Sequence, residues 1–217
     1  IFGFKTKQGG EMLLFSRQGV YVGHIGELMP KVQSVVDRVN ELVEDPLSVW
    51  ASVAGMPAGT LTFSGLMENH EKLGENNAKV LADNEWWDRV GSLREHSVGE
   101  TTDEIREIIH GTPSPENSVA WGVTAQIAPG QIANAMGWAI EIAEKVGSLA
   151  GSETVVLRDL YGPWGQMTWI TGFADMASVD AAQAAMAADP GYITMLDQGG
   201  DLFIPGTASQ RLATKLI

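Results

Sequence analysis

The sequence contains two approximate copies of one pattern, and this internal repetition most restricts the folds that the chain can adopt. Residues 19–43 align without a gap to residues 122–146 at an offset of 103. Residues 54–69 align to residues 161–176 at an offset of 107. Identity between the copies is low, but apolar segments and turns follow one another in the same order. We therefore expect two structural units of the same kind.

The stretch GTPSPENS, residues 111–118, separates the two copies. Its proline, serine and glycine residues are typical of a loop between structural units. We predict an N-terminal arm over residues 1–18, a first unit over 19–110 and a second unit over 119–217. A chain of 217 residues is long enough to bury a substantial core.

The apolar pattern predicts the same elements in each copy. In the first copy it predicts a strand at 19–25, a helix with apolar residues at spacings of three and four, and two strands at 47–55 and 60–67 around a Pro/Gly turn. A second helix follows at 69–82. The last part of the copy is predicted as a short helix, a strand near 92–98 and a terminal helical turn.

The order strand–helix–strand–strand–helix–strand is that of a ferredoxin-like unit. The helices of such a unit cover one face of its antiparallel sheet, and the other face must be buried by something else. The predicted strands are apolar on both sides, as expected for strands that are covered twice. We therefore predict an α+β fold in which two βαββαβ repeats pack their sheets face to face as an α+β barrel within one chain.

Both copies contain a break with aromatic residues, "ADNEWWDRV" in the first and "AADPGYITM" in the second. Asp83 and Asp189 are good N-cap residues for the helix that follows each break. Trp86 and Tyr192 then occupy the same position in the two copies. The adjacent indoles of Trp86 and Trp87 could form a ligand platform, but the repetition favours Trp86 as a structural anchor.

This order of elements, with the stretches "AADPGY" and "ADNEWW", resembles the dimeric α+β barrel superfamily. That superfamily includes NIPSNAP-type proteins, stress-responsive barrel proteins and cofactor-independent antibiotic-biosynthesis monooxygenases. The resemblance covers roughly residues 19–217, and its motif is a fold signature that contains no catalytic residue. Two chains usually form one barrel in those families, so the resemblance implies a fused pair here.

The net charge of −13 disfavours nucleic acid and anionic lipid as partners, because like charges repel. No apolar run is long enough for a membrane helix, and no secretory signal is present. The chain has no cysteine, which excludes disulfides and thiolate catalysis and is consistent with the cytoplasm. We expect a cytoplasmic protein that could form a homo-oligomer and binds neither nucleic acid nor membrane.

Sequence motifs for nucleophilic or metal-dependent catalysis are absent, so histidines are the candidate catalytic residues. No two histidines have i,i+4 spacing, and no metal site is predicted. His24 ends the first predicted strand, where it could be a base, a haem ligand or a hydrogen-bonded or solvated side chain. His70 opens the second predicted helix, where it could face a cavity or cap the helix.

Two kinds of residue are candidates for ligand binding. Arg158 and Asp159 interrupt an apolar strand, so each needs a partner or water. They could orient a polar ligand, or they could mark an edge strand that is protected by charge. Large aromatic residues are concentrated in the second copy, where they could bind a flat apolar molecule or fill the core. The aromatic candidates are Trp50, Trp121, Tyr161 and Trp169, and Trp138 and Trp164 lie in the same copy as the last three.

Two functions of different classes are compatible with these residues. The first is the binding of a small hydrophobic or aromatic molecule, or assembly, with no chemistry and no cofactor. The second is implied by the resemblance and is a cofactor-independent or haem-dependent monooxygenase activity. If only the second copy kept a pocket, the two halves of the barrel would differ in function.

Overall fold

The structure is a computed structural model that describes residues 12–217. Its first half contains β1 (Leu13–Tyr21), α1 (Ile25–Leu42), β2 (Ser48–Ala54), β3 (Thr60–Met67), α2 (His70–Leu81), α3 (Asn84–Arg94) and β4 (Ser97–His110). Its second half contains β5 (Val119–Gln126), α4 (Ile132–Ala150), β6 (Thr154–Tyr161), β7 (Gln166–Phe173), α5 (Met176–Ala188), α6 (Pro190–Gly199), the 3-10 turn η1 (Gly200–Leu202) and β8 (Ser209–Lys215). The two halves share one order of elements, as the sequence predicts.

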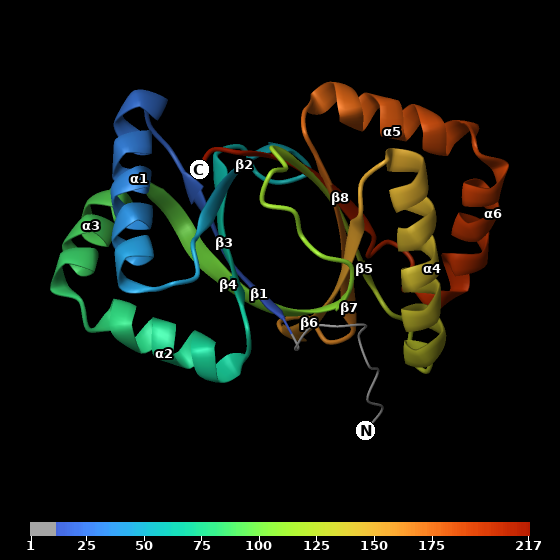
Figure 1. Cartoon of the computed structure of the whole chain (residues 1–217), viewed down its shortest axis with the longest axis horizontal. Coiled ribbons are helices and arrows are strands. Elements are labelled where there is room, and N and C mark those ends of the chain that lie inside the picture. Colours follow the sequence, from blue (N-terminus) through green and yellow to red (C-terminus); the bar gives the residue numbers. More distant parts are fainter. Residues whose placement is uncertain (1–11) are drawn as a thin grey trace.

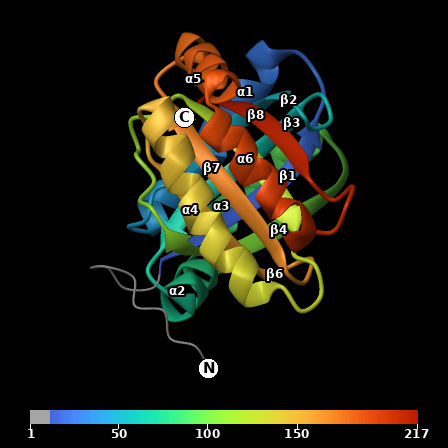
Figure 2. The ribbon, with the colours of Figure 1, turned by 90° about the vertical axis from the view of Figure 1, so that its right-hand side faces the viewer.

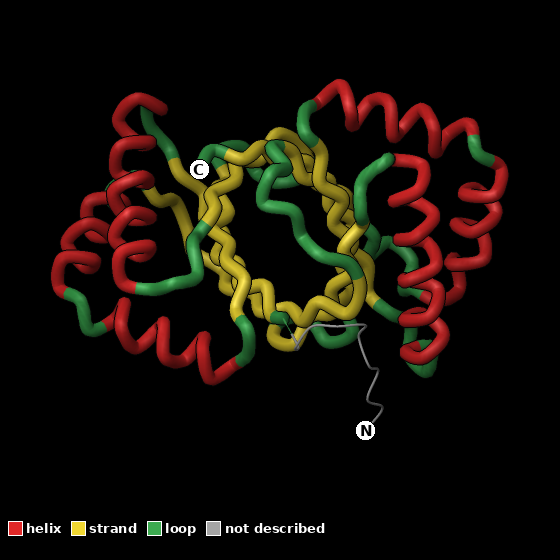
Figure 3. The backbone as a smooth tube through the Cα atoms, viewed as in Figure 1, coloured by secondary structure: helices red, strands yellow, loops and turns green. Residues whose placement is uncertain are grey.

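The strands form one closed antiparallel barrel in the order β1-β3-β2-β8-β5-β7-β6-β4. Figure 3 looks through this ring of strands. The two half-sheets face each other, and they also hydrogen bond at both seams, where β4 pairs with β6 and β2 pairs with β8. The prediction of an intrachain α+β barrel is confirmed. Closure leaves no free sheet edge among these strands.

Each half-sheet is covered on its outer face by the helices of the same half. Figure 1 shows α1, α2 and α3 on one side of the barrel and α4, α5 and α6 on the opposite side, and Figure 2 looks onto the second group. In the first half, Val32 and Val36 of α1 share a buried core with Val49 of β2. In the second half, Ala139 of α4 shares one with Met167 of β7. The molecule therefore has two helix–sheet cores on opposite sides of one barrel.

The break between the last two helices has the same construction in both halves. The carboxylate of Asp83 accepts a hydrogen bond of 2.7 Å from the backbone N–H of Trp86, and Asp189 accepts one of 2.7 Å from the N–H of Tyr192. Both aspartates are thus the predicted N-caps. Trp86 is only 7% exposed, which supports its role as an anchor.

A cation from the first helix of each half holds the cap residue in place. Arg38 of α1 lies 2.6 Å from a carboxylate oxygen of Asp83, and Lys145 of α4 lies 2.7 Å from one of Asp189. The hydrogen bond from Lys145, with that from the N–H of Tyr192, lowers the pKa of Asp189 below its ordinary value. The charged form of Asp189 therefore stabilises the folded chain.

The substitution Asp189→Asn should make stability less dependent on pH in acid. Because the folded-state pKa is lowered, the stabilisation is present above the unfolded pKa of about 4 and is lost as pH falls through the folded value. Asparagine keeps a capping oxygen but has no charge to lose. Urea unfolding from about pH 5 down to about pH 2 should give a flatter curve than the wild type. Asp180→Asn, at an exposed position of α5, is the control and should keep the wild-type slope.

The first and last strands of the first half differ from the prediction. β1 begins at Leu13, inside the segment predicted as an arm, and ends before most of the strand predicted at 19–25. Leu13 corresponds to Val119, so the halves are related by an offset of 106 here and not by 103. β4 covers Ser97–His110, where a terminal helical turn was expected, and β8 replaces the matching turn in the second half.

Paired polar residues are the reason for these differences. The strand β1 carries Ser16 and Arg17, and β4 carries Asp103 and Arg106, which hides the apolar alternation of a strand. Arg17 and Asp103 bind each other on the outer face through two bonds of 2.7 Å. Arg106 and Ser16 are hydrogen bonded on the inner face. Each of these four polar side chains thus has a partner on the neighbouring strand.

The linker 111–118 lies across one opening of the barrel, where it crosses the ring of strands in the view of Figure 3. The carbonyl of Pro115 accepts a hydrogen bond from Lys215 Nζ at 3.1 Å. Asn117 packs closely on Gly172. A Cβ added to Gly172 would lie only 2.0 Å from Nδ2 of Asn117. The linker therefore covers this end as well as joining the halves. Within residues 12–217, none of the helices has the length and apolarity needed to cross a membrane.

Candidate functional site

A cavity of about 300 Å³ lies between the sheet and the helices of the second half. Side chains from β5, β6, β7, α4, α6 and the segment before β8 line it. The largest of them are Trp121, Trp138, Trp169, Tyr192, Leu196 and Phe203. Because these residues come from all layers of the second half, the cavity exists only in the folded unit.

Three aromatic rings form a rigid wall of this cavity. The centroid of Trp138 is 6.0 Å from that of Trp169 and 5.4 Å from that of Phe203, in edge-to-face geometry. The indole N–H of Trp138 donates to the carbonyl of Met195 at 2.9 Å, and that of Trp169 donates to the carbonyl of Ala139 at 3.0 Å. Each indole has thus satisfied its polar atom within the protein, so the wall offers apolar ring surface to the cavity.

The polar groups of the cavity are few and uncharged. Thr154 and Thr171 share a hydrogen bond of 2.8 Å between their hydroxyls, and the N–H of Trp121 donates to Gln210 at 3.2 Å. The hydroxyl of Tyr192 makes no hydrogen bond within residues 12–217. Burial raises the pKa of Tyr192, so its hydroxyl remains protonated at neutral pH and can donate to a ligand.

The corresponding region of the first half has different residues. Val123 and Gln210 are opposite each other on β5 and β8, and Arg17 and Asp103 are the matching pair on β1 and β4. The first half therefore has an ion pair where the second has the uncharged residues Val123 and Gln210. The buried indole of Trp86 belongs to its core at the position of Tyr192. The two halves consequently differ in this space, as the uneven distribution of aromatics suggested.

The sequence candidates for ligand binding separate into two groups. Trp121 and Trp169 line the cavity. Trp50 lies elsewhere, on β2, and its N–H donates to the hydroxyl of Ser64 at 3.1 Å. Tyr161 is exposed at the end of β6, where its ring packs edge to face on His70 at 5.8 Å. The structure therefore brings only two of the aromatic candidates together.

Arg158 and Asp159 both have partners on β4, across the seam between the halves. Arg158 pairs with Glu107, and Asp159 lies 2.9 Å from Nε of Arg106. Gln166 donates to the second oxygen of Asp159 at 2.6 Å. The strand β6 is paired on both sides, so the alternative that it is a charged edge strand is wrong. Burial raises the pKa of Asp159, and the charge of Arg106 opposes this effect.

Neither histidine candidate lies at the cavity. β1 ends at Tyr21, so the expectation that His24 ends the first strand is wrong. His24 is instead the N-cap of α1 and accepts a hydrogen bond of 3.2 Å from the N–H of Gly26. His70 is the first residue of α2, after the N-cap Asn69, and packs on Tyr161.

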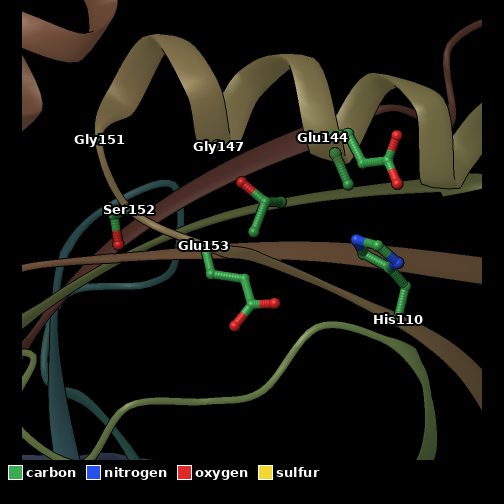
Figure 4. A pocket seen from close by; sticks show the side chains of 8 residues that line it. His110, Glu144, Gly147, Gly151, Ser152 and Glu153 are labelled. Atoms are coloured by element: carbon green, nitrogen blue, oxygen red, sulfur yellow. The ribbon is translucent and has the colours of Figure 1, made fainter. Parts of the chain in front are cut away.

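A second, open pocket of about 470 Å³ lies at the C-terminal end of α4. Figure 4 shows His110, Glu144 and Glu153 around it, with the imidazole of His110 facing the side of the pocket where the carboxylate of Glu144 lies. Thr154 belongs to the lining of both pockets. Within residues 12–217, no three His, Asp or Glu side chains are arranged to hold a metal ion.

Several lining residues were not among the sequence candidates. Tyr192 occupies the position of Trp86, but its phenol is smaller than the indole and leaves room. Phe203 forms a bridge with Ile127, and the matching pair in the first half is Ser97 and Tyr21. An aromatic residue at a position that is polar in the other copy is the signal that could have identified this wall.

Similarity to known proteins is seen in structure and not in sequence: no protein-family model matches the chain, and no curated protein matches it. A putative monooxygenase from Fusobacterium nucleatum has a similar structure, with a TM-score of 0.70, 10% identity and coverage of 96% of this chain and 94% of that one. An anthrone oxidase-like protein has a TM-score of 0.68 at 10% identity, with coverage of 97% of this chain and 93% of that one. A haem-binding protein from Thermus thermophilus gives 0.54 at 11% identity, covering 97% and 92%.

These likenesses extend over nearly the whole chain and concern the fold. The chain has the dimeric α+β barrel fold, with both units in a single polypeptide. Identities of 10–11% carry neither a substrate nor a catalytic residue from those proteins to this one.

Proposed function

We propose that the second half of the barrel binds a small, uncharged aromatic molecule in the cavity between its sheet and its helices. The observation that carries this proposal is the preformed wall of Trp138, Trp169 and Phe203. A charged ligand would lose its hydration without gaining a partner, because the side chains that line the cavity are uncharged. A flat apolar ligand would instead replace water against ring surfaces that are already held in place.

The volume and the hydroxyl groups narrow the ligand class. An apolar cavity of about 150 Å³ is sufficient for benzene, so about 300 Å³ gives room for roughly two fused rings. The hydroxyl of Tyr192 and the pair formed by Thr154 and Thr171 could hydrogen bond one ligand oxygen. These features favour phenols, naphthols and aromatic ketones over plain hydrocarbons.

Titration with 2-naphthol, followed by calorimetry and tryptophan fluorescence, should reveal one site per chain. Trp121→Leu should weaken binding by about 2- to 12-fold, because an aromatic contact contributes about 0.5–1.5 kcal/mol beyond its buried area. Trp164→Leu is the matched control, since Trp164 is 84% exposed on the β6–β7 turn. It should bind as the wild type does. Two equal sites per chain, or no effect of Trp121→Leu, would contradict the proposal.

A second candidate is cofactor-independent oxygenation of the bound aromatic molecule. The observation that favours oxygenation is the protonated hydroxyl of Tyr192. It lies in a cavity without charged side chains and can donate a hydrogen bond to a ligand oxygen. Likeness to structures described as a putative monooxygenase and an anthrone oxidase-like protein motivates the test. Oxygen consumption should be measured with anthrones and naphthols, for the wild type and Tyr192→Phe. A wild-type rate equal to that of buffer would remove this candidate and leave the binding function.

Haem does not fit the residues of this cavity. Its lining contains no histidine, cysteine or methionine side chain within the described part of the chain. Tyrosine can also ligate haem iron, but only as a phenolate, and burial raises the pKa of Tyr192. We therefore include no haem in the proposed function.

A further inference from the structure

Gly199, the last residue of α6, is buried directly beside the aromatic wall. A Cβ at this position would lie 2.4 Å from Cζ2 and 2.6 Å from Cε2 of Trp138. Carbon atoms that are not bonded pack about 3.5–4.0 Å apart, so a methyl group cannot be added without movement of the indole.

The backbone does not require glycine here. Gly199 has φ −77° and ψ −13°, which is an ordinary right-handed conformation for any residue. The lack of space beside the Trp138 ring is therefore the reason that position 199 has no side chain. The sequence motif "DQGG" reads as a simple helix end, and it hides this requirement.

Trp138 has few directions in which to move. Its N–H is bound to the carbonyl of Met195, and its ring packs against Trp169 and Phe203. Trp138 is also one of the lining residues of the cavity, so one side of the indole faces the ligand space. A methyl group at position 199 would displace the ring toward the ligand space.

We infer that Gly199 is the residue that sets the largest aromatic ligand the cavity admits, an inference that rests on the proposed binding function. The wild-type cavity has room for about two fused rings, and a displaced Trp138 would reduce that room. Position 199 thus determines specificity by size, although it contributes no side chain to the ligand.

The test compares phenol and 2-naphthol as ligands of the wild type and Gly199→Ala. We expect Gly199→Ala to weaken 2-naphthol binding about tenfold or more and phenol binding less than about threefold. Gly137→Ala is the control: it adds the same methyl group one residue before Trp138, on the exposed face of α4, where nothing lies within 4 Å of the added atom. Gly137→Ala should bind both ligands as the wild type does.

A relief variant shows whether the effect acts through the indole. Phenylalanine at position 138 lacks the atoms that Gly199→Ala would contact. Gly199→Ala with Trp138→Phe should therefore bind 2-naphthol within about threefold of Trp138→Phe alone. If Gly199→Ala does not fold, the double variant should fold again, and its failure to do so would overturn the inference.

The outcomes separate this inference from the proposed function. Unchanged 2-naphthol binding by Gly199→Ala, or an equal loss for both ligands, would overturn the size limit while the binding function stands. A wild type that binds neither ligand would overturn both.

Discussion

Replacing Arg106 with methionine should lower the free energy of unfolding by about 3–5 kcal/mol. Arg106 is 3% exposed in the barrel interior and holds two carboxylates, those of Glu104 and Asp159. Its removal leaves these buried carboxylates without the guanidinium that pairs with them, although the charge of Arg211 still acts on both, and this costs more than the loss of the hydrogen bonds. Urea unfolding at neutral pH measures the effect.

The matched control is Arg17→Met. Arg17 lies on β1 and pairs with Asp103 of β4 through two bonds of 2.7 Å, but both side chains are more than 40% exposed. An exposed pair contributes about 0–1 kcal/mol, so this substitution should cost far less. Equal losses of unfolding free energy for Arg17→Met and Arg106→Met would show that burial does not determine how much the ion pairs of Arg106 contribute to stability.

The loss of unfolding free energy caused by Arg106→Met should also depend on pH. Burial already raises the pKa of Asp159, and removal of the Arg106 charge raises it further. For an acid whose folded-state pKa is raised, stability is greatest below the unfolded pKa and falls as pH rises through the folded value. The difference in unfolding free energy between Arg106→Met and the wild type should therefore be smaller at about pH 4 than at pH 7.

The substitution Tyr192→Trp should abolish ligand binding, with a loss of about 100-fold or more for 2-naphthol. The first half already has tryptophan at this position: Trp86 follows the same capping aspartate and is buried in its core. An indole in place of the Tyr192 phenol would extend into the space that a ligand needs. Calorimetric titration of the folded variant gives the result directly.

The reverse substitution, Trp86→Tyr, provides the comparison. It should not create a second site, because Arg17 and Asp103 still form an ion pair where the second half has Val123 and Gln210. Two sites in Trp86→Tyr, or full binding by Tyr192→Trp, would show that this position does not control the cavity.

The repetition of elements was predictable from the sequence because helix caps and turns are local. Asp83 and Asp189 bind backbone groups three residues away, and the same signal occurs in both copies. β1 and β4 were not predictable in this way. The polar residues of these strands, such as Arg17 and Arg106, have partners on other strands that are distant in the sequence.

The candidate site was predictable only in part for the same reason. A concentration of tryptophans in the second copy indicated the half that has the aromatic-lined cavity, and Trp121 and Trp169 line this cavity. Whether an aromatic ring fills a core or walls a cavity depends on its neighbours across the layers. Gly199 shows this limit, since its importance comes from a ring on α4 and not from its own sequence context.

The unequal halves have a consequence for how such a barrel can change over generations. In a barrel made of two identical chains, every substitution appears in both cavities at once, so a residue that improves packing in one also closes the other. The linker 111–118 joins the halves in one polypeptide, and each can then acquire its own substitutions. An ion pair and a buried tryptophan can serve stability in the first half while the second retains an open, aromatic space. Fusion thus allows the two halves to differ in sequence and in role, which two identical chains cannot do.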